Sequence, residues 1–379
     1  MLGSRLAGLG LALLMTVSAC SGGAPGRTAA PSPPRATTSP EPTRRWPPAA
    51  AAGTAGYLAP GSDPSVLPGP VLIADKGNNR LLVVSPEGQV LWEWPQPGDL
   101  APGQTFLVPD DAFLTPDGRA VVATEEDDFV VTEIDLASRR IVWRYGTPGV
   151  HGSGPGQLWN PDDAMALPDG TVIAADIKNC RLVELSPSSP SPVWTLGTLG
   201  RCSHAPPDGF GSPNGVFPLP DGHFLVTEIR GDWVDEIDRA GHVYWSAHPD
   251  GVAYPSDSNQ YRPGQFMTVD YSNPGQVVVF DATGRALWRW NPSTGNGRLD
   301  HPSLALGLPN GDILLNDDAD HRVIVLDPAR DTIVWQYGHT GVPGSAPGYL
   351  DTPDGLDPVP PHSYADAVGL SAPAGRARG

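Results

Sequence analysis

Residues 161–194 read PDDAMALPDGTVIAADIKNCRLVELSPSSPSPVW. Short apolar runs follow one another in this stretch, and the first two are separated by Asp169-Gly170, a dipeptide that favours a β-hairpin turn. A third run, 181–185, is followed by a turn and then by a last run that contains Trp194. The stretch therefore predicts four short antiparallel strands joined by tight turns.

The same pattern recurs at a period of about 50 residues, which indicates a repeat protein. Each copy has a tryptophan in its last strand, an acidic residue that ends its second strand, and a proline that begins its first strand. The tryptophans are Trp92, Trp143, Trp194, Trp245, Trp288 and Trp335; the acidic residues, here called the ladder acids, are Asp75, Glu125, Asp176, Glu228, Asp270 and Asp317; the repeat prolines are Pro109, Pro161, Pro213, Pro255, Pro302 and Pro353. Four strands per copy and six copies predict an all-β fold, a six-bladed β-propeller with four-stranded blades.

The end of the repeats predicts how the ring closes. Pro353 begins a first strand that no second strand follows, whereas the first copy starts at Val71 with only a weak first strand before it. Residues 353–360 are therefore expected to pair with the strand at Val71, so that a C-terminal strand closes the first blade. Closure of this kind removes both exposed sheet edges.

The N-terminal residues predict export. Arg5 precedes an apolar stretch, 6–17, that is too short to span a bilayer comfortably, and Cys20 follows small residues. This pattern resembles the lipobox of bacterial lipoproteins, in which the cysteine is acylated and becomes the mature N-terminus. The resemblance implies a signal peptide over 1–19, lipidation of Cys20, and a protein anchored in the cell membrane at its extracytoplasmic face. An ordinary secretory signal with a chance cysteine is the alternative.

Composition divides the rest of the chain. Residues 20–56 are rich in Pro and Ala and are expected to form a disordered tether, 57–362 hold the propeller, and 363–379 are expected to be a disordered tail.

The net charge of −18 argues against nucleic acid as a partner. We expect a monomer that contacts the membrane through its lipid anchor.

Two cysteines remain once Cys20 is assigned to the lipid. In an exported protein, Cys180 and Cys202 are a candidate disulfide. The alternative is a pair of soft metal ligands, which the absence of a nearby histidine pair disfavours.

The repeat resembles known propeller families. Asp75-Lys76-Gly77-Asn78-Asn79-Arg80-Leu81-Leu82, together with the Pro-Asp-Gly hairpins, is similar to NHL-repeat propellers. The strands that end in Trp335 look like the tryptophan-docking strands of quinoprotein propellers, which have PQQ-binding-like repeats. These resemblances imply the fold, which hosts many functions; the sequence gives no indication of PQQ or a nucleotide.

Alternating strand directions place two sets of loops on one face of the predicted propeller, and these loops are acidic. Lactonase-type propellers hold a catalytic calcium on this face, where the loops surround the opening of the central channel. Asp111, Asp163 and Asp257 stand two residues after repeat prolines, where NHL-type blades often have the glycine that Gly215 and Gly355 keep here. Three like charges around one axis are unfavourable without a cation, so we predict that these carboxylates bind a divalent metal, with Ca²⁺ as the first candidate.

Other residues on this face are candidate ligand contacts. These are Asp110, Asp162, Asn214 and Asp354, which directly follow repeat prolines, and the less periodic Trp159 and Trp233. Aspartate and asparagine also cap turns by accepting hydrogen bonds from backbone N–H groups, and repetition in every blade favours that role for the ladder acids. The tryptophans of the repeat are expected to pack blade against blade.

The leading functional interpretation is recognition: a surface-tethered propeller that binds a small molecule, glycan or protein partner at its acidic central face. The alternative is a metal-dependent enzyme of lactonase type or an arylsulfotransferase-like one, with a quinoprotein-like protein third. Arylsulfotransferase-type propellers place a His-Asp pair before a Leu-Pro-Asn-Gly turn, but here His301 lies two residues too early. HExxH and GxSxG motifs are absent, and no catalytic residue can be assigned.

The lipobox generates a direct prediction. Replacing Cys20 with alanine removes the thiol that would be acylated, so Cys20→Ala should release or mislocalise the protein. Membrane fractionation measures this, and an unchanged membrane fraction for the variant would contradict lipid anchoring.

Overall fold

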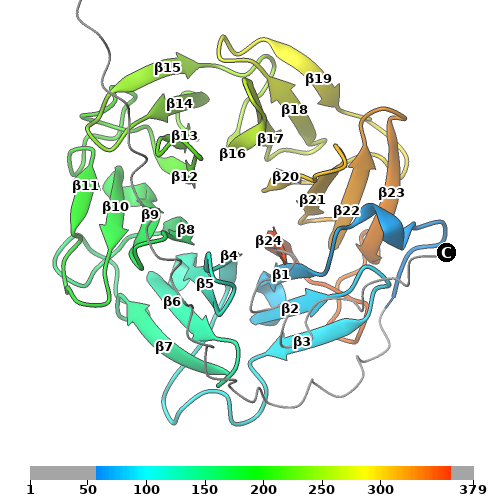
Figure 1. Ribbon diagram of the computed structural model, residues 1–379, viewed down its shortest axis with the longest axis horizontal. Coiled ribbons are helices and arrows are strands. Elements are labelled where there is room, and N and C mark those ends of the chain that lie inside the picture. The colour runs from blue at the N-terminus through cyan, green and yellow to red at the C-terminus, as the bar shows by residue number, and fades with distance from the viewer. Residues whose placement is uncertain (1–56, 360–379) are drawn as a thin grey trace, which may run out of the picture. The chain divides into compact units, whose positions relative to one another are not determined.

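The computed structural model describes residues 57–359. Within this range, six four-stranded antiparallel sheets stand around a central axis (Figure 1), which confirms the all-β, six-bladed propeller. The predicted signal peptide, Cys20, the tether up to residue 56, the last three residues of the predicted propeller and the predicted tail lie outside the described residues. No helix in the described part is long and apolar enough to cross a membrane.

The strands are given from the axis outward. Blade 1 contains β24 (Pro353–Pro358), β1 (Val71–Asp75), β2 (Arg80–Val84) and β3 (Val90–Trp94); blade 2 contains β4 (Pro109–Leu114), β5 (Ala120–Glu125), β6 (Val130–Asp135) and β7 (Arg140–Tyr145); blade 3 contains β8 (Pro161–Ala166), β9 (Val172–Asp176), β10 (Arg181–Leu185) and β11 (Trp194–Leu196). Blade 4 contains β12 (Pro213–Pro218), β13 (Phe224–Glu228), β14 (Trp233–Ile237) and β15 (Val243–Ala247); blade 5 contains β16 (Pro255–Arg262), β17 (Gln265–Asp270), β18 (Gln276–Phe280) and β19 (Ala286–Trp290); blade 6 contains β20 (Ala305–Gly307), β21 (Ile313–Asp317), β22 (Arg322–Asp327) and β23 (Thr332–Gly338).

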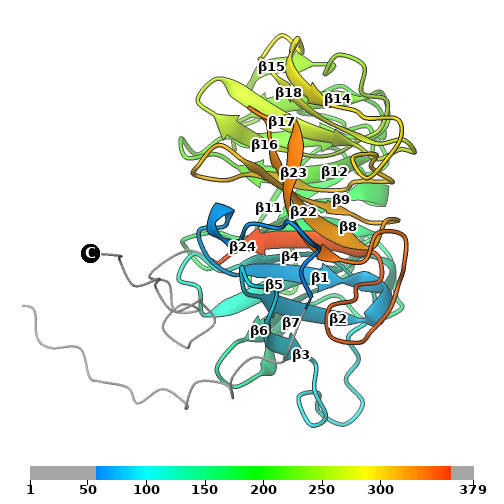
Figure 2. The same ribbon diagram turned by 90° about the vertical axis from the view of Figure 1, so that its right-hand side faces the viewer.

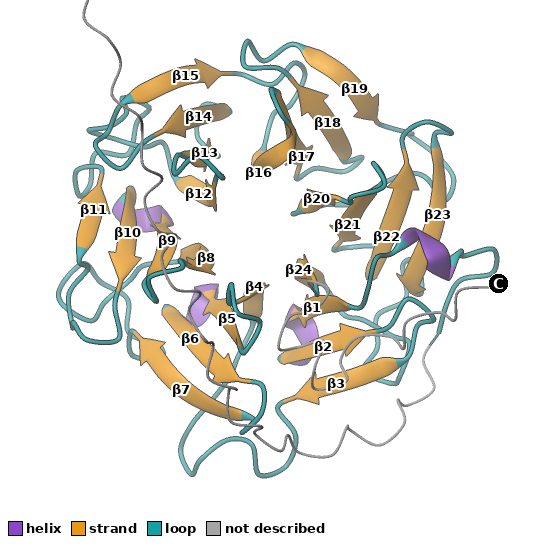
Figure 3. Ribbon diagram, viewed as in Figure 1, coloured by secondary structure: helices purple, strands orange, loops and turns teal. Residues whose placement is uncertain are grey.

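Single 3₁₀ turns interrupt several connections, as Figure 3 shows in purple. They are η1 (Pro64–Val66), η2 (Lys76–Asn78), η3 (Glu126–Asp128) and η4 (Ile177–Asn179). The last three join second to third strands in blades 1, 2 and 3, directly after a ladder acid. They therefore place side chains beside the central axis.

The C-terminal strand closes the ring as predicted. β24 pairs antiparallel with β1, with Val71 opposite Pro358 and Ile73 opposite Leu356. Figure 2 shows the two strands side by side, although they come from opposite ends of the described chain. Blade 1 is thereby completed by residues that follow blade 6, and neither strand is left as an open edge.

Packing explains the different sequence patterns of inner and outer strands. Every residue of β1, β9 and β21 is buried, because neighbouring blades cover both faces of each sheet near the axis. The outer strand β3 alternates between buried and half-buried positions instead.

The repeated tryptophans join neighbouring blades. The indole N–H of Trp194 donates to the carbonyl of Arg239 in blade 4 at 3.0 Å, and that of Trp335 donates to Pro86 in blade 1 at 2.8 Å. Trp335 is fully buried. The expected packing of blade against blade is therefore present at these positions.

The ladder acids have one structural role in common. Each accepts a hydrogen bond from a backbone N–H in the loop that leads into the first strand of a sheet. The donors are Asp351 to Asp75, Leu107 to Glu125, Trp159 to Asp176, Gly211 to Glu228, Tyr254 to Asp270 and Asp300 to Asp317. The turn chemistry expected from the repetition of these acids is thus found in every blade.

The predicted disulfide is present. Cys180, which follows η4, is bonded to Cys202 in the loop between blades 3 and 4, with 5.1 Å between their Cα atoms.

One small difference from the repeat occurs in blade 6, where β20 begins at Ala305 rather than at Pro302. There the side-chain oxygen of Asn316 accepts the N–H of Leu304 at 2.8 Å in place of a backbone carbonyl.

Ring closure predicts the effect of a truncation. Ending the chain before Pro353 removes β24 and exposes an edge of β1, so the protein should lose far more stability than the roughly 0.5–3 kcal/mol of an ordinary point mutation. Thermal melting measures this loss. Deleting only 363–379 is the matched control and should leave the melting temperature unchanged; a wild-type melting curve for the longer truncation would contradict the role of β24.

Candidate functional site

The first strand of most blades begins with an irregular register. A β-bulge follows Pro109 in β4, Asp162 in β8 and Pro255 in β16. Asp163 at the second bulge adopts φ = 50°, a left-handed conformation that is uncommon for residues other than glycine. Bulges of this kind redirect side chains, and here they turn the residues after the repeat prolines toward the axis.

Three carboxylates that the sequence predicted as metal ligands come together at the axis. Asp111, Asp163 and Asp257, here called the inner cluster, each have an oxygen within 4.8 Å of the other two. Their exposed fractions are 4%, 0% and 2%. One oxygen of each, Oδ1, is buried without a hydrogen-bond partner among the described residues. Buried polar atoms nearly always have a partner, so these three orphaned oxygens require an explanation.

Gly215 leaves the space in which the carboxylates of Asp163 and Asp257 come close to each other. A Cβ atom at this position would lie 2.9 Å from Oδ2 of Asp163 and 2.9 Å from Oδ1 of Asp257, closer than real Cβ contacts occur. Blade 4 therefore contributes space, while blades 2, 3 and 5 contribute carboxylates. The glycine that the repeat keeps in blade 4 is a steric requirement of the inner cluster.

Burial and mutual repulsion act on the protonation of the inner cluster. Burial, followed by the charges of Asp257 and Asp163, raises the pKa of Asp111 well above its usual value. Burial raises the pKa of Asp163 to about 7, and burial together with the Asp163 charge raises the pKa of Asp257. Without a cation, the cluster holds protons near neutral pH that an unfolded chain would release.

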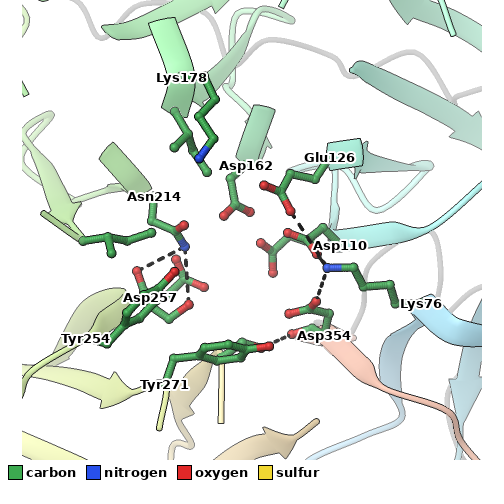
Figure 4. Close-up of a pocket in the computed structure, with 15 residues that line it drawn as sticks. Lys76, Asp110, Glu126, Asp162, Lys178, Asn214, Tyr254, Asp257, Tyr271 and Asp354 are labelled. Carbon is green, nitrogen blue, oxygen red and sulfur yellow. Dashed lines mark hydrogen bonds and ion pairs between the residues drawn. The ribbon is translucent and has the colours of Figure 1, made fainter. Parts of the chain in front are cut away.

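A lysine forms ion pairs with the acids nearer the mouth of the central pocket. Lys76 is the first residue of η2, and its Nζ contacts the carboxylate of Asp110. The same Nζ lies 2.6 Å from Oδ2 of Asp354 and 3.9 Å from Oε2 of Glu126 (Figure 4). Burial opposes ionisation of Asp354, but Lys76 outweighs it and lowers the pKa of that carboxyl to about 2. The pKa of Asp110 is raised, first by burial and then by the Asp354 charge. The inner cluster has no such lysine or arginine contact in the described part of the chain.

These groups line a pocket of about 150 Å³ at the centre of the ring. The six residues that directly follow the repeat prolines all line it: Asp110, Asp162, Asn214, Ser256, Ser303 and Asp354. Residues that directly follow ladder acids form a second ring: Lys76, Glu126, Ile177, Ile229 and Tyr271. Asp111 and Asp257 also line the pocket, as do Lys178 and Tyr254.

The structure thus separates the predicted ligand contacts into two groups. Asp110, Asp162, Asn214 and Asp354 line the pocket, but Trp159 and Trp233 do not. Trp159 is 39% exposed and stacks on His151 with 4.5 Å between ring centroids. Trp233 is contacted by His204 and His248. Their side chains are engaged by neighbouring loops rather than directed at the axis.

Sequence reasoning missed the aromatic and basic lining. Lys76, Tyr254 and Tyr271 were not singled out, although each is adjacent in sequence to a ladder acid or a repeat proline. Counting one residue beyond each ladder acid would have found Lys76 and Tyr271. That signal is periodic and was available from the repeat itself.

The raised carboxyl pKa values predict a pH dependence. In chelator-containing buffer the folded protein binds more protons than the unfolded chain, so stability should rise as pH falls from 8 toward 6, by up to about 1.4 kcal/mol per pH unit for each such group. Urea unfolding at several pH values measures this. Replacing Asp111, Asp163 and Asp257 with asparagine should reduce the slope, although other buried carboxyls such as Asp235 and Asp357 keep part of it, whereas Asp221→Asn at an exposed turn should leave it unchanged. A wild-type stability that falls from pH 8 to 6 would contradict the assignment.

Comparison with known proteins adds information on the fold. No protein-family model matches this chain, and no curated protein matches it. Among solved structures, a protein of unknown function from Bacteroides caccae is 15% identical, with 76% of this chain and 98% of that chain covered and a TM-score of 0.54. Virginiamycin B lyase from Staphylococcus aureus is 15% identical (70% and 83% covered, TM-score 0.48), and a streptogramin B lyase is 14% identical (76% and 88%, TM-score 0.49). At this identity the first likeness concerns the fold alone, and no function is carried over from any of the three.

Proposed function

We propose that this protein is a lipid-anchored, extracytoplasmic propeller that binds a divalent cation, with calcium as the expected ion, and a small polar ligand in its central pocket. The observation that carries the proposal is the inner cluster, in which three buried carboxylates each keep one oxygen without a partner. An enclosed group of like charges is unfavourable unless protons or a cation join it. A cation would satisfy all three orphaned oxygens at once.

The donor set supports calcium. All donors of the inner cluster are carboxylate oxygens, which suit hard cations, and no histidine or cysteine of residues 57–359 lines the pocket. Oxygens bound to one calcium ion lie about 2.3–2.6 Å from it, so pairs of them can be up to about 5 Å apart. The separations within 4.8 Å in the inner cluster are compatible with that geometry. Asp111 also groups with Asp110 and Asp162, which could extend the coordination toward the mouth.

The outer part of the pocket supports recognition of a small ligand. Lys76 contacts Asp110 and Asp354 and supplies one positive charge among the acids at the mouth, so this part of the pocket offers both an ammonium group and carboxylates to a ligand. Tyr254, Tyr271 and Asn214 add aromatic surface and an amide to the lining (Figure 4). A pocket of about 150 Å³ is smaller than the roughly 300–1,000 Å³ of sites for drug-sized ligands, which favours an ion and a few-atom ligand over a glycan chain or a protein segment.

A metal-dependent enzyme is the second candidate, and Asp162 is the observation that favours it. Asp162 lines the pocket beside the inner cluster, and burial followed by the Asp111 charge raises its pKa well above the usual value. A carboxyl of this kind could act as a general base or acid on a ligand held by the cation. Turnover that is lost in Asp162→Asn while calcium binding is kept would favour the enzyme over the binding protein.

Calcium should raise the melting temperature of the full chain in a concentration-dependent way, because an ion that binds only the folded state stabilises it by about 2.7 kcal/mol at a hundred times its Kd. Differential scanning fluorimetry with calcium, magnesium and manganese measures the shift. The triple replacement of Asp111, Asp163 and Asp257 by asparagine should remove most of it.

The matched control is Asp221→Asn, in an exposed turn of blade 4, which should respond to calcium as the wild type does. If none of the three metals shifts the wild-type melting curve, the cation site is wrong. The pocket would then be an acidic docking surface for a basic ligand.

A further inference from the structure

Blade 4 departs from the way in which the other blades hold their ladder acids. In five blades a basic or amide side chain donates a hydrogen bond to the ladder acid; the donors are Arg80, Arg144, Arg181, Gln276 and Arg322. In blade 4 the residue opposite Glu228 across the strands is Trp233, which cannot neutralise it. Instead, Nδ1 of His204 lies 2.8 Å from Oε1 of Glu228. No lysine, arginine or amide side chain in residues 57–359 is hydrogen-bonded to Glu228.

Asp235 is the second departure. Two residues into the third strand, four other blades have an aliphatic side chain and one has a threonine; these residues are Leu82, Val183, Val278, Ile324 and Thr132. Asp235 is 0% exposed, and no lysine, arginine, amide or backbone N–H among the described residues donates to it; only the Glu228 carboxyl and the Ser246 hydroxyl lie within reach of its oxygens. The other blades do without a carboxylate here, and a buried carboxylate that no cationic side chain balances is costly.

The three side chains have the donors and spacing of a metal site. Nδ1 of His204 lies 3.8 Å from Oδ2 of Asp235 and 2.8 Å from Glu228, and a ligand atom of each lies within 4.8 Å of the others. Tetrahedral zinc, with bonds of about 2.0–2.2 Å, needs ligand atoms about 3.4 Å apart, a value between the two histidine distances. One imidazole nitrogen with two carboxylates is a donor set that suits zinc better than calcium.

The histidine of this group is held in place by its surroundings. The ring of His204 stacks on Trp233 with 3.9 Å between centroids and an interplanar angle of 7°. Cys202, two residues earlier, is tied to Cys180 by the disulfide. The His204 side chain is 21% exposed, which leaves one side of the group accessible to water. Such support reduces the ordering cost of binding a metal.

From these observations we propose that His204, Glu228 and Asp235 form a zinc site in blade 4, separate from the central pocket. None of the three residues lines that pocket, so the proposal does not depend on the calcium site. Zinc would take the place of the arginine that balances the ladder acid in blades 1, 2, 3 and 6, and it would fasten the loop between blades 3 and 4 to the sheet of blade 4. Three protein ligands leave the fourth position for water.

Zinc titration of the purified full chain tests the proposal. After dialysis against a chelator and then chelator-free buffer, isothermal calorimetry with zinc chloride should show a site that Asp235→Asn and, independently, His204→Ala weaken at least about tenfold. Asp235→Asn keeps the side-chain shape, and His204 lies on a loop, so at least one variant should remain folded. Circular dichroism establishes this for each.

Two controls make the result specific. His223→Ala removes a histidine from the more exposed group of Asp221, His223 and Glu236 in the same blade, and should bind zinc as the wild type does. Asp163→Asn removes an inner-cluster carboxylate and should also leave this site intact.

Absence of zinc binding by the wild type, or wild-type affinity in both Asp235→Asn and His204→Ala, would overturn the proposal. In either case the group would be a set of side chains that share protons. Loss of zinc binding in Asp163→Asn alone would place the zinc in the central pocket and would equally overturn it.

Discussion

The hydrogen bond from a loop N–H to a ladder acid organises this propeller. In each blade a buried carboxylate at the end of the second strand binds the loop that leads into the first strand of a sheet. The bond fixes where the first strand begins, and hence which residues reach the axis. The residues that directly follow the repeat prolines therefore line the central pocket in every blade, together with residues that follow the ladder acids.

Buried carboxylates need compensation, and the molecule supplies it unevenly. Arginines pair with four of the six ladder acids, and Lys76 pairs with acids at the mouth of the pocket. No arginine or lysine of the described residues contacts the inner cluster, and Asp163 adopts a left-handed backbone conformation there. Unusual conformations and unpaired charges persist where the surrounding structure holds them, and they are concentrated at functional sites. This combination distinguishes the inner cluster from the other acids of the chain.

Repeat proteins allow a comparison that most folds do not, because each blade is a control for the others. A feature shared by all blades, such as the ladder acid, is explained by the fold. A feature found in one blade, such as Asp235 among aliphatic equivalents, is not needed by the fold and calls for another explanation. The same reasoning separates Asp111, Asp163 and Asp257 from Gly215 and Gly355, which occupy equivalent positions.

The sequence by itself determined the number of blades, their strand order, the closing strand, the disulfide and the residues that approach the axis after each repeat proline. It could do so because strand period and repeat period together fix the register of backbone positions. Tertiary structure alone decided that Lys76 pairs with acids at the mouth of the pocket, that Trp159 and Trp233 turn to neighbouring loops, and that His204 meets Glu228 and Asp235. In each case at least one partner comes from a loop, and which side chains a loop residue meets is set by long-range contacts between blades rather than by the repeat pattern.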